Sequence, residues 1–163
     1  MSLQIREATP ADAGRLSFLI NALADYEHLS HESNPDAAAL ARHLSPDAQP
    51  RCHALVAEQD GEVIGMALYF FNYSTFLTRW NIFLEDLFVL PDFRGTGTGF
   101  ALLKALARVA VAHNCERLDW NVLDWNQLAI DFYEKLGAKP MADWTTMRLA
   151  GDALQQMGAP EAA

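Results

Sequence analysis

The sequence is poor in cysteine. Cys52 and Cys115 are the only two in 163 residues, and they lie far apart, without the short spacing of a zinc-binding pair. Neither a disulfide framework nor a structural zinc site is therefore expected. Because disulfides are rare where thiols are kept reduced, this usage predicts a cytoplasmic protein.

Basic residues are also scarce. Twelve Lys and Arg stand against 21 Asp and Glu, which gives a formal net charge of −9 and a pI near 4.8. Nucleic-acid binding needs a basic surface for phosphate contacts, so this balance predicts no nucleic-acid partner. An acidic chain suits a cationic substrate better, and the same charge also serves solubility.

Long hydrophobic runs are missing as well. The longest, residues 63–71, is too short to span a bilayer, and the N-terminus lacks the basic-then-apolar order of a signal peptide. We therefore expect no membrane partner. The length, with 51% hydrophobic and 20% charged residues, predicts a single globular domain over residues 1–163.

The hydrophobic periodicity predicts a mixed α+β fold. Two strands at residues 53–58 and 62–73 are joined by Gln59-Asp60-Gly61, and Asp-Gly is a strong hairpin signal. A third strand follows from about residue 80. The other expected elements are a strand at 3–8, a helix from 9 to about 28, a short helix at 36–44, a helix at 98–113, a strand at 117–122, a helix at 126–136, a strand at 144–149 and a fraying end over 151–163.

Three histidines, His28, His31 and His43, lie in or beside the polar stretch 29–50. Their spacing matches no ligand set of a known metal site. We interpret them as solvated surface residues and expect no metal.

The stretch from residue 83 to residue 99 carries the strongest functional signal. Residues 82–90 are apolar on both faces except for Glu85 and Asp86, which is typical of a buried strand. Successive side chains of a strand point to opposite faces, so both carboxylates can reach one cleft only if the strand is bulged. Their alternative interpretation is structural, as a cap and a partner of an arginine.

Glycines at 95, 97 and 99 follow the strand and lead directly into a helical pattern. Unpaired backbone N–H groups at a helix start bind phosphate or pyrophosphate, and Arg94 can add charge. A dinucleotide fingerprint would need Gly-x-Gly-x-x-Gly, which is not the spacing here. The remaining alternative is a tight turn without a ligand.

Arg94-x-x-Gly97-x-Gly99 resembles the acetyl-coenzyme A (acetyl-CoA) signature of the GNAT acetyltransferase superfamily. Other motifs resemble the spermidine/spermine (diamine) N-acetyltransferase family, and together they cover nearly the whole chain. These motifs are Tyr26-Glu27, Leu84-Glu85-Asp86-x-Phe88-Val89, Trp125-Asn126 and Phe132-Tyr133-x-x-x-Gly137-Ala138.

The resemblance implies a GNAT fold, in which helices flank a central, mostly antiparallel, twisted sheet. It also implies acetyl transfer from acetyl-CoA to a primary amine of a small, dicationic substrate, such as a diamine, a polyamine or a thialysine-like or lysine-like compound. The stretch 72–76 has no acidic residue where the spermidine enzymes carry aspartate, so the resemblance does not select among these amines.

Site residues follow from the same resemblance. Glu85 is expected to act as the base or to position water, and Tyr133 to act as the acid that protonates the leaving thiolate. Tyr26, Glu27, Glu85 and Asp86 are expected to bind the substrate; core packing is the alternative for Tyr26 and for Tyr133. The residues expected to bind the cofactor are Phe88, Val89, Arg94, Gly95, Thr96, Gly97, Thr98, Gly99, Asn126 and Tyr133.

The resemblance further implies a homodimer. Two alternatives to the small-amine enzyme remain at this point. One is a non-catalytic module that binds acetyl-CoA for regulation, and the other is a GNAT enzyme for a different amine, such as an aminoglycoside or a protein amine.

Overall fold

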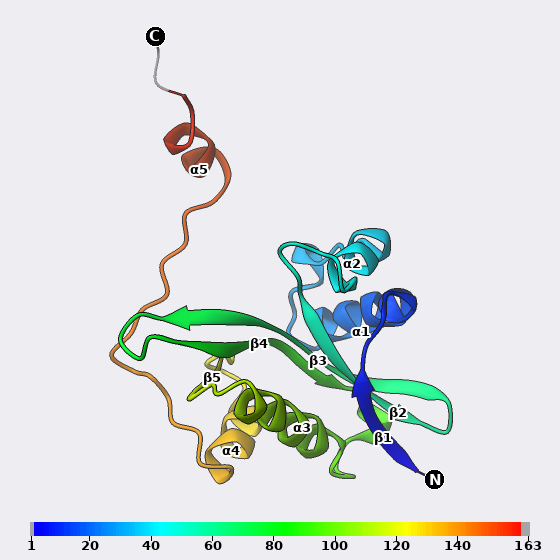
Figure 1. The fold of residues 1–163 in the computed structure, drawn as a ribbon. Helices are drawn as coiled ribbons and strands as arrows, with labels where there is room; N and C mark the ends of the chain where they lie inside the picture. The colour runs from blue at the N-terminus through cyan, green and yellow to red at the C-terminus, as the bar shows by residue number, and fades with distance from the viewer. Residues whose placement is uncertain (1, 161–163) are drawn as a thin grey trace. The chain divides into compact units, whose positions relative to one another are not determined.

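The computed structural model describes residues 2–160, in two compact units, Met1–Leu123 and Asp124–Ala163 (Figure 1). The first unit is built on a five-stranded sheet of order β1-β2-β3-β4-β5, antiparallel from β1 to β4 and parallel between β4 and β5. The strands are β1 (Leu3–Glu7), β2 (His53–Gln59), β3 (Glu62–Ser74), β4 (Arg79–Val89) and β5 (Leu118–Trp120). The predicted mixed, mostly antiparallel sheet is confirmed.

Local sequence signals place the elements before β4. Asp60 and Gly61 both have positive φ, 53° and 84°, which is the backbone that a two-residue hairpin turn requires between β2 and β3. Thr9 and Asp12 form a capping box around the short 3₁₀ helix η1 (Pro10–Asp12), which leads into α1 (Ala13–Tyr26). The Asp36 side chain accepts from the N–H groups of Ala38 and Ala39 at the start of α2 (Ala37–Leu44).

Helices cover both faces of the sheet. Figure 1 shows α1 and α2 on one face and α3 (Thr98–Ala112) on the other. Two further 3₁₀ turns, η2 (Ser30–Glu32) and η3 (Pro91–Phe93), lie in the connections after α1 and after β4. The helix that follows the glycine turn therefore begins at the end of the strand that carries the two carboxylates.

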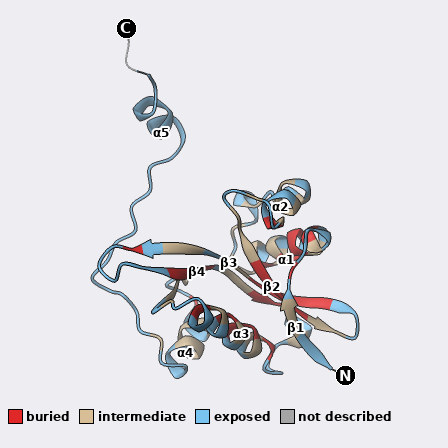
Figure 2. Ribbon diagram, in the orientation of Figure 1, coloured by how far each residue is buried: buried red, intermediate tan, exposed pale blue. Residues whose placement is uncertain are grey.

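The core lies between each helical layer and the sheet, and Figure 2 shows the buried residues gathered there. On the side of α1, the cluster includes Leu16, Leu19, Val56 and Met66, none of which is exposed. Each such side chain stabilises the fold by about 1.5–3 kcal/mol relative to an exposed one. On the other side, Leu102 and Leu106 anchor α3 in the same way.

One glycine allows β3 and β4 to approach at the end of β4. A Cβ atom on Gly65 would lie 2.9 Å from the carbonyl oxygen of Phe88 and 3.3 Å from a methyl group of Leu102. Because a backbone oxygen cannot move aside cheaply, a side chain at position 65 would push apart the backbone of β3 and β4 at Phe88 and Val89, and glycine avoids this.

A β-bulge interrupts the pairing of β3 with β4. Leu68 pairs with Asp86, whereas the next residue, Tyr69, pairs with Leu84, so Glu85 is an extra residue in β4. The inserted residue sends Leu84 and Asp86 to opposite faces, although two residues apart on a regular strand share one face. Asp86 thereby shares a face with Leu68, on the side of α1.

In the unit Asp124–Ala163, α4 (Gln127–Lys135) begins where the sequence predicts it, capped by Asn126, and Gly137 follows it with φ 91°. The predicted strand at 144–149 is wrong: those residues join no strand among the described ones. A strand needs a neighbour for its ladder hydrogen bonds, and no periodicity within the segment supplies one.

The predicted fraying end is also wrong over most of its length. Residues Gly151–Met157 form the helix α5, which good helix formers such as Ala153, Leu154 and Gln155 favour. The part of the prediction that covers 161–163 lies outside the described residues. The predicted strand at 117–122 is confirmed in its centre as β5.

Candidate active site

Three carboxylates come together where α1 ends over β4. Burial, then the negative charge of Glu85, then that of Glu27, raise the pKa of Asp86 to about 6. Glu27 caps the C-terminal end of α1 and is half-buried, and burial raises its pKa as well. Glu85, the bulge residue, is exposed. The structure thus brings carboxylates that are 58 or more positions apart in the sequence into one acidic cluster.

The bulge explains how two adjacent carboxylates act on one another and on Glu27. In a regular strand Asp86 would share the face of Leu84, which is 1% exposed beneath α3. The inserted Glu85 turns Asp86 toward α1 instead. The sequence analysis required a bulge in this strand if Glu85 and Asp86 were to reach one cleft, and the structure has that bulge.

The predicted substrate residue Tyr26 lies beside a predicted cofactor residue. The guanidinium of Arg94 is 4.7 Å from the centre of the Tyr26 ring and 5.2 Å from that of Phe88, and its Nε donates to the carbonyl of Val89 at 2.8 Å. Such cation–π contacts hold the charge in place. Arg94 therefore joins the end of α1 to the end of β4.

The glycine turn has the geometry of an anion cradle. Gly95 and Gly97 have φ of 75° and 88°, and a Cβ atom on either would meet nothing within 4 Å, so the space in front of the turn is open. Gly97 is the N-cap of α3, and no side chain caps that helix. The first N–H groups of α3 are thus available to a ligand.

Two threonines brace the turn. The Thr96 hydroxyl donates to the carbonyl of Phe93 at 2.7 Å and lies 3.0 Å from the hydroxyl of Thr98, which is 2% exposed. Gly99 follows in the first turn of α3, where a Cβ atom would make only an ordinary contact with Val89. The cradle is consequently held by its own side chains while its amides stay open.

The other predicted cofactor residues on β4, Phe88 and Val89, lie next to a free strand edge. β5 pairs with β4 only at residues 82–84, so within residues 2–123 no strand adjoins β4 at 85–89 on that side. Backbone groups along such an edge can pair with an extended ligand.

In the second unit, the Asn126 side chain accepts from the N–H of Ala129 at 3.3 Å and is 7% exposed. Tyr133 lies on α4, with its ring centre 5.3 Å from that of Phe132. Asn126 therefore caps α4 with its side-chain oxygen, and any ligand contact of this side chain must be compatible with that hydrogen bond.

Sequence reasoning missed two features of the site. Gly65, an isolated glycine in a strand pattern, is the known signal of close backbone approach and was available in the sequence. The bulge at Glu85 has no such signal, because it depends on the register between two strands.

Among residues 2–160, no group of three or more His, Cys, Asp or Glu side chains is placed to hold a metal ion. Nor does any described helix combine the length and the apolar character needed to cross a membrane.

Comparison with known proteins agrees with this geometry. Residues 17–138 match the model of the acetyltransferase (GNAT) family. Among solved structures, an integron cassette protein from the mobile metagenome of V. cholerae matches with a TM-score of 0.81 at 27% identity, over 98% of this chain and 99% of that one. An aminoglycoside acetyltransferase from an uncultured soil sample shares the fold, with a TM-score of 0.75 at 21% identity, over 92% and 100%.

Curated relatives are similar along almost their full length. The thialysine N-epsilon-acetyltransferase of Bos taurus is 40% identical over 95% of this chain and 96% of its own, and that of Mus musculus 37% over 96% and 97%. An L-ornithine N5-acetyltransferase of Arabidopsis thaliana is 32% identical over 95% and 87%.

The chain belongs to the GNAT family of acetyltransferases. It is an N-acetyltransferase, and enzymes of this family use acetyl-CoA as co-substrate. The non-catalytic alternative is not favoured by any of the relatives found.

The raised pKa of Asp86 predicts a pH-dependent cost in stability. Because the folded-state pKa of about 6 exceeds the ordinary value of 3.8, the folded protein loses stability as pH rises from about 4 to 6. Asp86→Asn should therefore raise the free energy of unfolding by about 1–3 kcal/mol at pH 7.5 and have little effect below pH 4. Urea denaturation at both pH values measures this.

Asp47→Asn is the matched control, since Asp47 is exposed in the loop after α2. It removes the same charge without relieving burial. An Asp86→Asn gain that is equal at pH 4 and pH 7.5 would contradict the assignment.

Proposed function

We propose that this enzyme transfers the acetyl group of acetyl-CoA to a primary amine of a small substrate that carries a second positive charge. The observation that supports this most is the cluster of Glu27, Glu85 and Asp86, in which burial first, and then the charges of Glu85 and Glu27, raise the pKa of Asp86 to about 6. A dication would relieve that repulsion. The relatives named for thialysine and L-ornithine point to the same class, which includes diamines, polyamines and lysine-like amines.

The turn 95–99 is our candidate for the pyrophosphate site. Gly95, Gly97 and Gly99 would let the oxygens reach the N–H groups of the turn and of the first residues of α3, with Thr96 and Thr98 supporting the loop. Arg94 would add positive charge from its place beside Tyr26. The open space in front of Gly95 and Gly97 supports this fit.

The free edge of β4 is our candidate for the pantetheine site. The backbone groups of Phe88 and Val89 would pair with its amides as a neighbouring strand does. Asn126 would contribute its side-chain amide while its oxygen caps α4.

The carboxylates supply the proton chemistry. A primary amine is protonated at pH 7, because its pKa lies near 10, and it must lose a proton before it attacks a thioester. We assign proton acceptance, directly or through water, to Glu85, the exposed bulge residue. Asp86 and Glu27, with Tyr26 beside them, would hold the substrate's positive charges.

Tyr133 is the proposed general acid. A tyrosine hydroxyl can protonate the leaving thiolate in the active site and recover its proton from solvent. In this scheme the two compact units act as one catalytic domain over 1–163, since the family match at 17–138 crosses their boundary. We also propose a cytoplasmic homodimer, on the resemblance and the cysteine usage described above.

Gly97→Ala should weaken acetyl-CoA binding by about tenfold or more, because the new methyl group occupies the space that the pyrophosphate needs. Gly61→Ala is the matched control: Gly61 has nearly the same φ, 84°, and equally open surroundings, in the β2-β3 turn. Both variants should lose similar stability. Calorimetry that finds equal affinities for the two would exclude the cradle.

Tyr133→Phe should lower kcat by roughly 100-fold with little change in acetyl-CoA affinity, as expected on loss of a positioned proton donor. Thiol release under saturating substrate measures kcat. Tyr73→Phe, which alters an exposed tyrosine of the β3-β4 hairpin, should be fully active. Wild-type turnover by Tyr133→Phe would remove Tyr133 from the mechanism.

The substrate class is tested with an amine panel. A monoamine leaves a half-buried carboxylate unpaired, at a cost of about 1–3 kcal/mol, so kcat/KM for putrescine, spermidine or thialysine should exceed that for a monoamine of equal length by roughly tenfold or more. Glu27→Gln should reduce this difference in kcat/KM between dicationic amines and the monoamine. Glu62→Gln, an equal charge change at the exposed first residue of β3, should preserve this difference in kcat/KM.

If the wild-type enzyme and the Glu27→Gln variant both acetylate monoamines as well as they acetylate diamines, the dicationic-substrate proposal fails. The acetyltransferase assignment would stand.

A further inference from the structure

A cavity lies on the sheet face that α3 covers. It has a volume of ≈ 440 Å³, and β1, β2, β3 and the last turns of α3 line it, with Arg108 and His113 on the helical side. The glycine cradle is at the opposite end of α3, and the ten residues of helix from Thr98 to Arg108 separate the two by about 15 Å. Asp86 faces the other side of the sheet. This cavity, the α3 cavity, is therefore separate from the proposed active site.

The charges around the α3 cavity oppose those of the whole protein. The chain has a formal net charge of −9, yet Arg51 and Arg108 line the cavity, and Glu7 is the one carboxylate in its lining. Glu7 offsets part of this positive charge. A local excess of cationic groups in an acidic protein attracts an anion.

Neither arginine is paired with a carboxylate among the described residues. Arg6, Arg15 and Arg79, in contrast, each form an ion pair at 2.9 Å or less. Arg51 makes one long hydrogen bond, from Nε to the carbonyl of Leu44 at 3.4 Å. Two guanidinium groups are thus left to bind a ligand, and their planar fork suits a carboxylate or phosphate group.

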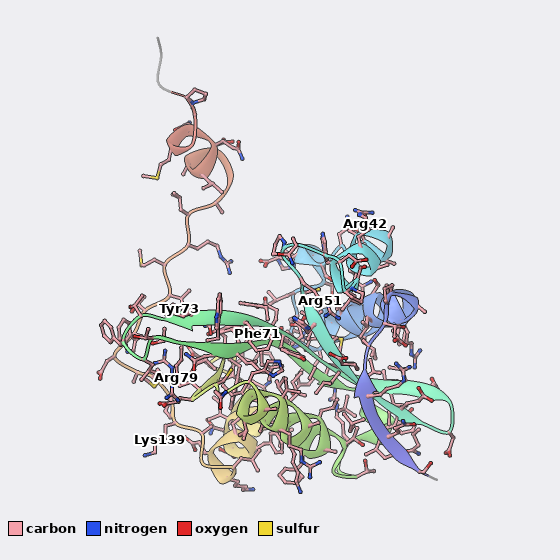
Figure 3. All side chains as sticks on the ribbon, viewed as in Figure 1. Arg42, Arg51, Phe71, Tyr73, Arg79 and Lys139 are labelled. Atoms are coloured by element: carbon pink, nitrogen blue, oxygen red, sulfur yellow. The ribbon has the colours of Figure 1, made fainter. Side chains whose placement is uncertain are left out.

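The wall of the α3 cavity is aromatic. His53 stacks on Tyr69 at 5.2 Å, and Phe71 lies 5.5 Å from His53 and 5.1 Å from His113 (Arg51 and Phe71 are labelled in Figure 3). The Nδ1 atom of His113 is held by the Val109 carbonyl at 2.9 Å, so its Nε2 atom remains for another partner. These rings give an organic ligand a flat surface to pack on.

Tyr69 adds an unused donor. The residue is only 2% exposed, and burial raises the pKa of its hydroxyl to about 12, so the group stays protonated. No hydrogen bond to the Tyr69 hydroxyl is found in residues 2–160, and its oxygen is not among the buried unpaired side-chain atoms, so it is accessible from the cavity that Tyr69 lines. A ligand oxygen in the cavity would satisfy it.

We propose that the α3 cavity binds a small organic anion, with its carboxylate or phosphate group held by Arg51 and Arg108 and its body packed against His53, Tyr69 and Phe71. The volume suits a metabolite of modest size, since ligand sites range from about 300 to 1,000 Å³. Glu7 lies where a hydroxyl or ammonium group of the same ligand can be bound.

The experiment is calorimetry at low salt with three probes: succinate for the carboxylate, glycerol 3-phosphate for the phosphate, and glycerol as the neutral control. We expect at least one anion to bind the wild-type protein and glycerol not to bind. Arg51→Gln and Arg108→Gln should each weaken that binding by about tenfold or more, as for loss of a charged hydrogen-bond donor.

Two variants locate the binding. Arg42→Gln removes the same charge from α2, on the other face of the sheet, and should leave the affinity unchanged (Figure 3). Gly97→Ala should also leave it unchanged, which separates this cavity from the acetyl-CoA cradle. The proposal is overturned if neither anion binds at millimolar concentration, if both arginine variants bind like wild type, or if Gly97→Ala alone abolishes binding.

Discussion

The burial of like charges at the end of α1 is the constraint on which the active site depends. Burial of Asp86, together with the charges of Glu85 and Glu27, raises its pKa to about 6. Burying like charges lowers the stability of a fold, so other contacts must offset the loss. Here the apolar core beneath α1, which includes Leu16, Leu19 and Met66, provides them. The same repulsion is the physical basis of the proposal that this site binds a positively charged substrate.

One strand joins this acidic region to the cofactor side. The bulge at Glu85 turns Asp86 toward α1, and three residues later Phe88 and Val89 present a free backbone edge. Gly65 holds that edge close to β3, while Arg94 links it to Tyr26. The proposed amine and acetyl-CoA sites therefore lie on neighbouring parts of β4, an arrangement that suits direct attack of one on the other.

The two ends of α3 have different surroundings. Its N-terminus follows glycines that keep backbone amides open, whereas its C-terminus borders a cavity with stacked rings and with two arginines that form no ion pair with a carboxylate of residues 2–160. An acidic enzyme that attracts cations at one site can thus attract an anion at another, because local charge and not net charge decides what binds.

The sequence by itself determined the family, the hairpin at Asp60-Gly61, the cap at Asn126 and the glycine turn, because each depends on a few adjacent residues with their own backbone preferences. It also indicated that Glu85 and Asp86 could serve one cleft only if β4 were bulged. Tertiary structure decided the rest. Whether β4 is bulged, which face Asp86 takes, and that 144–149 form no strand depend on register and on neighbouring strands, and these are set by residues far away in the chain.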